Sequence, residues 1–446
     1  MSYNNKYSYK PFEIASKSSH SNIINDKKVK SFLDKCRIPP FQEIENTDIK
    51  EYFLDDLIEN PIKIIIAVDG GYTDVAVKEE YPSSTIAFFQ FGALLLNYDD
   101  LKVIEEKPFV DPDDFSRLTN INRWKLVLPT KGLTDQKDGG TLTSFVRKTI
   151  FDFFNSTDLD DQRLIETLGW LLFEKYKPSG LESWELSHCP VCGKPVEIKE
   201  AQLENYSTKC PNCNEIIYLT DVFRLHEAID DELGASGVLG YLSTTIEQLL
   251  IVQLIKGILK VKADLLRQIL IVKDGPLAFF GQTANIHRPM LELIRYLKSH
   301  HDINLVGLEK GGAFVEHASM IKDKIKDNQI VLLGSDYIFK YILPGKPKKD
   351  IIYGSSTYYS HKLIFKSRYG NVYVASIPTF ELKHDPTFDD YINWQTILNN
   401  IAYLRCDLYY NSLVPVVLAN KLVSLSDHPS ADILKTFAKE NIRIEL

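Results

Sequence analysis

Two short apolar runs that end on the same dipeptide constrain the fold of this chain more than any other feature. The first is IKIIIAV before Asp69, and the second is ILIV before Lys273 and Asp274; a glycine follows each aspartate. Runs of Ile, Val and Leu bounded by polar residues are typical of strands buried in a sheet. Ligands of open α/β sheets bind at the carboxyl ends of such strands.

Each aspartate has two interpretations. Asp-Gly is a common turn dipeptide, so either pair alone could be only a turn. A carboxylate at the end of a strand, followed by glycine, also leaves room for a bulky ligand. Because two such strands can be neighbours in a sheet, we predict that Asp69 and Asp274 contribute to one divalent-metal site.

The composition is that of an ordinary globular protein. The 446 residues, 44% of them hydrophobic and 25% charged, predict two or more folding units. The formal net charge of −8 argues against binding nucleic acid by bulk electrostatics, but it allows a local DNA-binding groove. The first residues lack an apolar signal-peptide core, and no stretch reaches the roughly 18 apolar residues of a membrane span, so a cytoplasmic protein is expected.

Four cysteines form two CxxC pairs, Cys189 with Cys192 and Cys210 with Cys213. Two such pairs at this separation are typical of a Zn²⁺ ribbon, in which each tight turn directs two thiolates at one tetrahedral ion. Two disulfides are the alternative, which a reducing compartment disfavours. Because the protein would fill all four ligand positions, the zinc is expected to be structural.

The pattern along the chain predicts an α/β fold with a mixed sheet flanked by helices. Residues 1–25 are expected to be a disordered tail, and residues 26–59 contain helical patterns at 28–36 and 48–59. Residues 60–106 predict an antiparallel meander made of runs at 62–68, 72–77 and 85–96. Residues 107–235 are interpreted as an insertion of helices and a zinc ribbon at 186–218. Residues 236–446 should complete the sheet, with two helices at the C-terminal end.

Two further residues are candidates by position. Glu247 falls on the apolar side of a helix predicted from Leu242 to Lys260, where a carboxylate is costly without a partner such as a metal ion. The alternative is that its charge simply favours the nearby helix start. Lys310 follows the strand INLVGL and precedes two glycines that open a helix, a suitable place to hold a phosphate. It could also be an ordinary surface lysine.

Taken in order, AVDGGYTDVAV, the helical Glu247, ILIVKDGPLAFFG and LVGLEKGG resemble the motifs of the NurA nuclease family. The resemblance covers residues 60–100 and 236–425. It implies an RNase H-like sheet, with Asp69, Glu247 and Asp274 as ligands of Mn²⁺ or Mg²⁺ and Lys310 beside the scissile phosphate. It also implies a homodimeric DNA nuclease that acts with a HerA-type hexameric ATPase in DNA end processing or defence against foreign DNA. Such chemistry suits hard oxygen ligands and a nearby cation.

The chain departs from the family at two places. The family's C-terminal motif has Tyr-Pro followed by Ala-His, whereas this chain has Val414-Pro415 and Ala419-Asn420. The three carboxylates could suffice without the histidine, or His384 or Asp407 could replace it. The zinc-bearing insertion is the second departure from the simplest family members.

Two other functions remain open from the sequence. VDGGYTD also resembles the first phosphate loop of actin-like sugar kinases, although Pro276 and Leu277 stand where their second phosphate loop would be. A non-catalytic zinc-ribbon adaptor of the ATPase–DNA complex would explain the missing Tyr and His. For DNA binding, the basic segments at 346–349 and 362–368 are candidates to line a channel, or they are solvated surface.

Overall fold

The computed structural model describes residues 18–36, 49–57, 59–78, 83–99, 120–135, 139–157, 163–344, 351–406, 412–425 and 431–442. The chain divides into two compact units, Met1–Ile44 and Glu45–Leu446. The described part of the first unit contains helices α1 (Ser18–Asn25) and α2 (Lys27–Leu33). The Asp26 carboxylate caps α2 by accepting hydrogen bonds from the backbone N–H groups of Lys28 and Val29. Residues 18–25 are therefore helical rather than part of a disordered tail; residues 1–17 lie outside the described residues.

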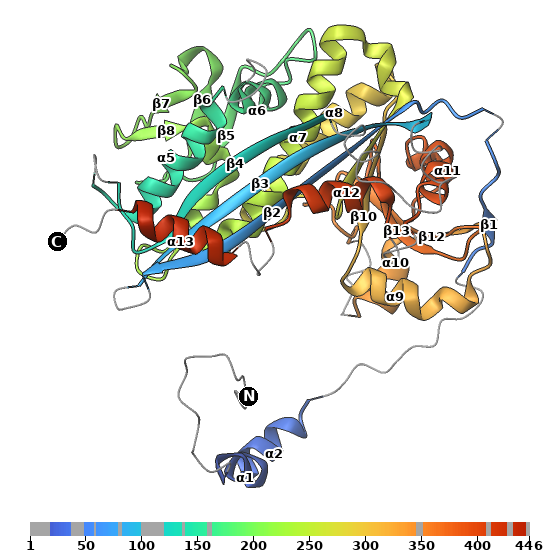
Figure 1. Ribbon diagram of the computed structural model, residues 1–446, viewed down its shortest axis with the longest axis horizontal. Coiled ribbons are helices and arrows are strands. Elements are labelled where there is room, and N and C mark those ends of the chain that lie inside the picture. The colour runs from blue at the N-terminus through green and yellow to red at the C-terminus, as the bar shows by residue number, and fades with distance from the viewer. Residues whose placement is uncertain are drawn as a thin grey trace. The chain divides into compact units, whose positions relative to one another are not determined.

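The described part of the second unit is built on a nine-stranded mixed sheet with the order β1-β11-β12-β13-β10-β9-β2-β3-β4 (Figure 1). β9 is parallel to both β2 and β10, and the other neighbours are antiparallel. The predicted mixed α/β architecture is confirmed. Its strands are β1 (Tyr52–Phe53), β2 (Ile64–Lys78), β3 (Ser84–Asn97), β4 (Asn120–Lys131), β9 (Ile269–Asp274), β10 (Asn304–Glu309), β11 (Gln329–Leu332), β12 (Ser360–Lys366) and β13 (Val372–Pro378).

β2 is one continuous strand that contains both the first apolar run and the extended piece at 72–77. Asp69 therefore lies within a strand and not at its end. The pairing of β2 with β9 stops at Val68, opposite Lys273, whereas the pairing of β2 with β3 continues along almost the whole strand. The predicted meander exists, but its members are β2, β3 and β4. β4 comes from the segment that the sequence assigned to the insertion.

The helix predicted at 48–59 is wrong. Tyr52 and Phe53 form β1, which pairs with β11, and the backbone N–H of Leu54 donates to the carbonyl of Asn328. The Tyr52 ring packs edge-on against Phe388 at 4.9 Å between centroids. Tertiary pairing with a distant strand overrides the local helical pattern here.

Helices cover both faces of the sheet, and the alternation of side chains along β2 assigns each face. Ile66 and Val68 pack into a core cluster with α7, whereas Ile65 and Ala67 pack into a second cluster with α11 and α12. Figure 1 shows α12 and α13 in front of the long strands, where α12 contacts β2 and β3 and α13 contacts β2. The α-helices among the described residues of this unit are α5 (Leu142–Asn155), α6 (Leu164–Leu172), α7 (Leu239–Lys262), α8 (His287–His300), α9 (Ala313–Ile321), α10 (Ser335–Tyr337), α11 (Trp394–Tyr403), α12 (Val414–Val423) and α13 (Asp432–Asn441).

Two small antiparallel sheets lie between α6 and α7 in the chain. One pairs β5 (Ser183–Leu186) with β6 (Val196–Lys199), and the other pairs β7 (Ser207–Lys209) with β8 (Ile216–Tyr218). Their buried residues belong to the same core cluster as α5, α6, α7 and α8. Among the described helices, none is long and apolar enough to cross a membrane.

Candidate active site

Asp69 and Asp274 lie side by side on neighbouring parallel strands. The β2–β9 register pairs Val68 with Lys273, and the next residue on each strand is one of the two aspartates. Ala67 and Val272, two residues earlier on each strand, both pack into the cluster beneath α11 and α12. Because side chains alternate along a strand, both carboxylates face the α12 side of the sheet.

Asp69 is buried and holds an incompletely bonded carboxylate. Its Oδ1 accepts a hydrogen bond of 2.8 Å from the backbone N–H of Gly70, while its buried Oδ2 accepts none from the described residues. Burial raises the pKa of Asp69 to about 7, and the nearby charges of Asp274 and Glu247 add to the rise. A buried carboxyl group beside two others is a site that favours a bound cation.

Lys310 and Asn420 complete this face of the site. Lys310 follows β10, and its Nζ lies 2.6 Å from Asp274 Oδ2. Asn420, on α12, interacts with the Asp69 carboxyl group; together with Lys310 it opposes the rise in the Asp69 pKa. The position where the resembled family has histidine therefore does reach Asp69, but it carries an amide.

Glu247 approaches the same strands from the opposite face. It is buried on α7, where Ser243 donates to its Oε1 at 3.3 Å and Lys273 Nζ lies 2.7 Å from its Oε2. A Cβ atom on Gly70 would lie 2.9 Å from Oε1, so the carboxylate rests directly on the backbone of β2. Burial raises the pKa of Glu247, and the Lys273 ammonium opposes that rise.

The side chains present fit a site in which two carboxylates hold one divalent ion better than a site built from three carboxylates. Among the described residues, the groups of three or more side chains whose ligand atoms lie within 4.8 Å of one another do not include Asp69, Glu247 and Asp274. Asp69 and Asp274 offer hard oxygen ligands on one face, and Asp69 Oδ2 lacks a partner. Glu247 already has a cationic partner in Lys273.

Lys273 is the functional candidate that the motif analysis missed. It interrupts the buried run ILIV-Lys-Asp, and its side chain is only 3% exposed. The signal was present in the sequence, since a lysine inside a buried strand requires an acidic partner.

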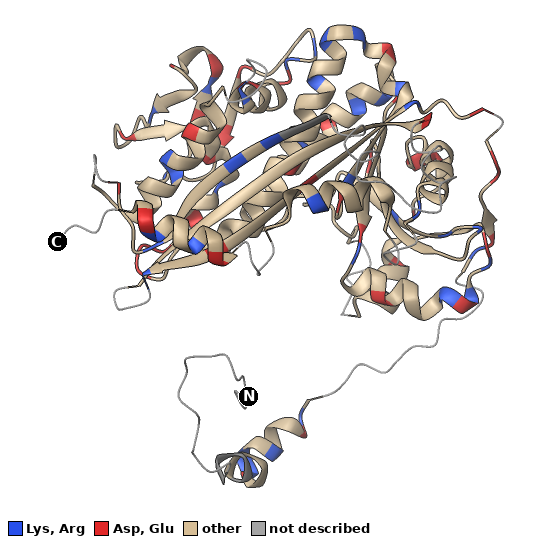
Figure 2. Cartoon of the chain, viewed as in Figure 1, with Lys and Arg blue, Asp and Glu red and all other residues tan. Residues whose placement is uncertain are grey.

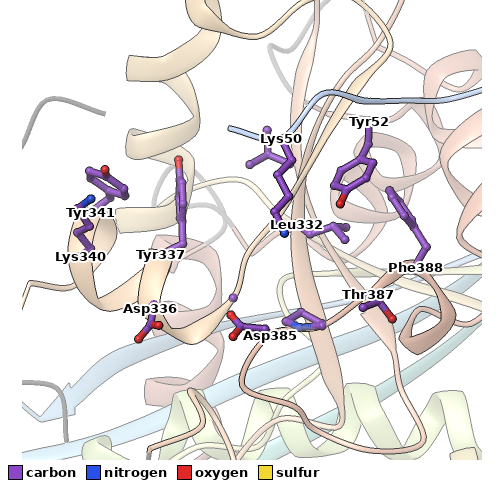
Figure 3. Close-up of a pocket in the computed structure, with 13 residues that line it drawn as sticks. Lys50, Tyr52, Leu332, Asp336, Tyr337, Lys340, Tyr341, Asp385, Thr387 and Phe388 are labelled. Atoms are coloured by element: carbon purple, nitrogen blue, oxygen red, sulfur yellow. The ribbon is translucent and has the colours of Figure 1, made fainter. Parts of the chain in front are cut away.

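His384 does not replace the family histidine. It lies near Asp336 and Asp385, and the ligand atoms of these three residues are within 4.8 Å of one another. Strands β12, β13, β10 and β9 separate β11, which precedes Asp336, from β2. Asp336 and Asp385 line a separate pocket of about 460 Å³ whose walls include Tyr52, Tyr337, Tyr341 and Phe388 (Figure 3). Asp407 lies outside the described residues.

The four paired cysteines come together as the sequence predicted. Their sulfur atoms lie within 4.8 Å of one another, with Sγ–Sγ distances of 3.8 Å for Cys189–Cys213 and for Cys192–Cys210. Each CxxC pair occupies the turn of one small hairpin, between β5 and β6 or between β7 and β8. Four sulfur ligands converging from two hairpins can hold one tetrahedral metal ion.

The two turns have matching backbone conformations. Gly193 and Asn214, each one residue after the second cysteine of its pair, have φ values of +70° and +64°. The backbone N–H groups of Val191 and Asn212 point at Cys189 Sγ and Cys210 Sγ over 3.5 and 3.4 Å. These N–H groups favour thiolate over thiol, as a metal-binding turn requires.

The basic segment at 362–368 is committed to internal contacts. Lys362 is buried, with its Nζ 2.7 Å from Glu309 Oε1 and 3.5 Å from the centroid of the Phe314 ring. Lys366 donates to the carbonyls of Lys322 and Ile325. The expectation that this segment lines a DNA channel is therefore wrong for both lysines, because neither ammonium group is available to a phosphate. The segment at 346–349 lies outside the described residues.

A different basic stripe lies on the face of the sheet that carries Asp69. Asp69 pairs with Gly92 on β3, and Gly92 pairs with Arg123 on β4, so the three residues form one row across the meander. Arg123 and Lys125 are exposed, and no ion pair links them to an acidic residue within the described ranges. Figure 2 shows basic residues along β4, the outermost strand of the meander. Two strand spacings place the stripe about 10 Å from Asp69.

Comparison with known proteins yields structural neighbours but no sequence match. No protein-family model and no curated protein matches the chain. The NurA nuclease from Sulfolobus solfataricus is 10% identical with a TM-score of 0.31, covering 96% of this chain and 97% of that one. A second NurA crystal structure is 11% identical (TM-score 0.29, 96% of both chains), and one with manganese is 12% identical (TM-score 0.30, 96% and 99%). All three neighbours carry the name of the family that the sequence motifs resemble.

Proposed function

We propose that this chain is a divalent-metal-dependent DNA nuclease with an RNase H-like core. The observation that carries the proposal is the pair of Asp69 and Asp274 on adjacent parallel strands, with Lys310 held against Asp274. The strand order also supports it, because the antiparallel meander β4-β3-β2 continues into parallel β9 and β10. Hydrolysis of a phosphodiester bond needs hard oxygen ligands that hold a cation and a fixed positive charge beside the phosphate.

Each residue has a distinct role in this proposal. Asp69 and Asp274 would hold Mn²⁺ or Mg²⁺, which when bound supplies Lewis-acid chemistry and a water of lowered pKa. Lys310 would neutralise charge on the phosphate, and in the absence of substrate it orients Asp274. Asn420, on α12, opposes the rise in the Asp69 pKa and so favours the ionised carboxylate that a metal ion requires. Glu247, the third carboxylate proposed from the sequence, can join the set only if its ion pair with Lys273 opens.

The charge distribution supports a nucleic-acid substrate. The exposed Arg123 and Lys125 provide local positive charge in a chain whose formal net charge is −8. Phosphates beyond the scissile bond would contact Arg123 and Lys125 at the β4 edge of the same face. The family resemblance of the motifs adds the remaining parts of the proposal: a homodimer that acts with a HerA-type hexameric ATPase in end processing or defence.

We also propose that the four paired cysteines bind one structural Zn²⁺. The convergence of their sulfur atoms and the matched turns support this proposal. Because no fifth side chain is needed, this ion would stabilise the ribbon rather than react with substrate.

The nuclease proposal is tested with end-labelled duplex and single-stranded DNA in Mn²⁺ or Mg²⁺. The purified protein should degrade DNA only with the divalent ion, and Asp69→Asn or Asp274→Asn should reduce cleavage by at least about 100-fold, because each removes a proposed ligand. Asp74→Asn is the matched control on the same strand, since Asp74 bonds Thr130 and Ser236 away from the site. Absence of metal-dependent cleavage by the unaltered chain would favour the adaptor, and ATP-dependent phosphorylation of a sugar would identify the kinase.

A further inference from the structure

We infer that the Lys273 ammonium replaces a second metal ion, so that this site binds one divalent cation per chain and not two. The inference rests on the proposed nuclease function and specifies its metal stoichiometry. It concerns the α7 face of the site, where the structure holds Glu247 against Lys273.

Lys273 is fixed from two directions. Its Nζ lies 2.7 Å from Glu247 Oε2 and donates a 2.6 Å hydrogen bond to the backbone carbonyl of Asp274. The side chains of Lys273 and Glu247 are 3% and 9% exposed, so both charges are removed from water. A buried ion pair breaks at high cost, because either partner alone would leave an uncompensated charge.

The geometry leaves no suitable coordination position beside Glu247. Two-metal sites hold their ions roughly 3.5–4 Å apart, with carboxylates shared between them. Here the Glu247 oxygens contact Lys273 and Ser243, and the Asp69 and Asp274 carboxylates face the other side of the sheet. A divalent ion at Glu247 would have to lie against the Lys273 ammonium, where like charges repel in a buried environment.

The charges of the site also suit one ion. The carboxylates of Asp69, Glu247 and Asp274 are partly balanced by the ammonium groups of Lys273 and Lys310, which leaves one negative charge when all are ionised. One divalent ion and one phosphate then bring the total to zero. A second divalent ion would leave two positive charges in a largely buried cluster, which is unfavourable.

The test is the number of Mn²⁺ ions bound by the zinc-loaded, full-length protein, measured by isothermal titration and by Mn²⁺ electron paramagnetic resonance. The unaltered protein should bind one Mn²⁺ per chain and give the spectrum of an isolated ion. Lys273→Met keeps the length of the side chain but removes its charge, so Glu247 is released and a second Mn²⁺ should bind beside it. The double variant Lys273→Met/Glu247→Gln should return to one ion.

Two comparisons keep the inference falsifiable if Lys273→Met does not fold. Glu247→Gln alone should still bind one Mn²⁺ with less than about a threefold change in Kd, because Glu247 is not a ligand. Lys310→Met removes the other ammonium group of the site and should leave the stoichiometry at one. A spin-coupled pair of Mn²⁺ ions in the unaltered protein, or loss of Mn²⁺ binding in Glu247→Gln, would overturn the inference. A protein that cleaves DNA with two bound ions would refute it while leaving the nuclease proposal intact.

Discussion

Gly70 and Glu247 are fitted to each other: a Cβ atom on residue 70 would lie 2.9 Å from Glu247 Oε1 and 2.6 Å from the Phe91 ring. The glycine is what allows α7 to bring its carboxylate down onto β2. Gly70→Ala should therefore displace the helix or the ring and lower the free energy of unfolding by about 1–3 kcal/mol, as overpacking does. Urea denaturation monitored by circular dichroism measures the change.

The control for this variant is Gly257→Ala on α7, the helix that carries Glu247, where an added Cβ meets no atom within 4 Å. Alanine has the higher helix propensity, so this substitution should be neutral or stabilising by up to about 1 kcal/mol. Equal destabilisation by both substitutions would contradict the packing argument.

Stability should fall as pH rises from about 4 to 7 in buffer without added divalent ions. Burial raises the native pKa of Asp69 to about 7 from its ordinary value of 3.8, so in this window the native state retains a proton that the unfolded state has lost. Because the native state binds more protons, the free energy of unfolding decreases with pH, by a total on the order of 2–4 kcal/mol. Denaturation at pH 5 and pH 7.5 measures the slope.

Asp69→Asn separates this effect from other titrations. The amide cannot ionise, so the variant should lose most of the pH dependence and be more stable than the unaltered protein at pH 7.5. An unchanged slope in Asp69→Asn would show that another group titrates in this range.

Cys189→Ser or Cys213→Ser should release the bound zinc and destabilise the main sheet as well as the zinc ribbon. Cys189 packs in the same core cluster as residues of α5, α6 and α7, so folding energy supplied by the metal reaches the main sheet. We expect a zinc content near zero, by mass spectrometry, and a lower melting temperature. Cys36→Ser, at an exposed cysteine of the first unit, is the control that should retain the metal. Retention of zinc in Cys189→Ser would refute the ribbon.

Replacing the basic stripe should weaken DNA binding without preventing metal binding. In Arg123→Gln/Lys125→Gln, affinity for DNA of any sequence should fall, and the slope of log K against log salt should decrease by about 2, because two phosphate contacts are lost. Fluorescence anisotropy between 50 and 200 mM salt, about a fourfold range, measures the slope. Lys260→Gln/Lys262→Gln makes the same charge change at exposed positions of α7 and should leave the slope unchanged.

Partnership is the part of the proposal that depends most on the motif resemblance. We expect a homodimer in solution and cleavage of duplex DNA that increases at least about tenfold when a HerA-type ATPase and ATP are present. Light scattering and a cleavage assay with and without ATP test these expectations. A chain that is monomeric at micromolar concentration and indifferent to the ATPase would contradict them.

Local sequence pattern predicted the elements whose burial is uniform. The apolar runs of β9 and β10 are examples, since a strand buried on both faces is a continuous hydrophobic stretch. β4 was missed, although Leu126 and Leu128 alternate with Arg123 and Lys125 as in a half-buried strand. Its polar positions resembled a loop in a segment already interpreted as an insertion.

The site was harder to predict because its contacts cross between distant segments. The sequence placed Asp69, Asp274 and Lys310 on or directly after strands that are neighbours in the sheet. It did not show which face of the sheet each side chain occupies. Only the strand register shows that Glu247 approaches from the opposite side and that Lys273, rather than an ion, lies against it. The motif comparison identified Asn420 only as the residue in place of the family's histidine, and the fold is what brings it close to Asp69.

The parallel pairing of β2 with β9 has a consequence for when the proposed activity can arise. Asp69 and Asp274 are about 200 residues apart in the chain, so a ribosome working at roughly 5–20 residues per second needs about 10–40 s to make the intervening segment. The hairpins of β2, β3 and β4 have local contacts and can form during that time, whereas the carboxylate pair cannot. A fragment that ends before β9 carries one aspartate of the pair, so the proposed cleavage could begin only after most of the chain has been synthesised.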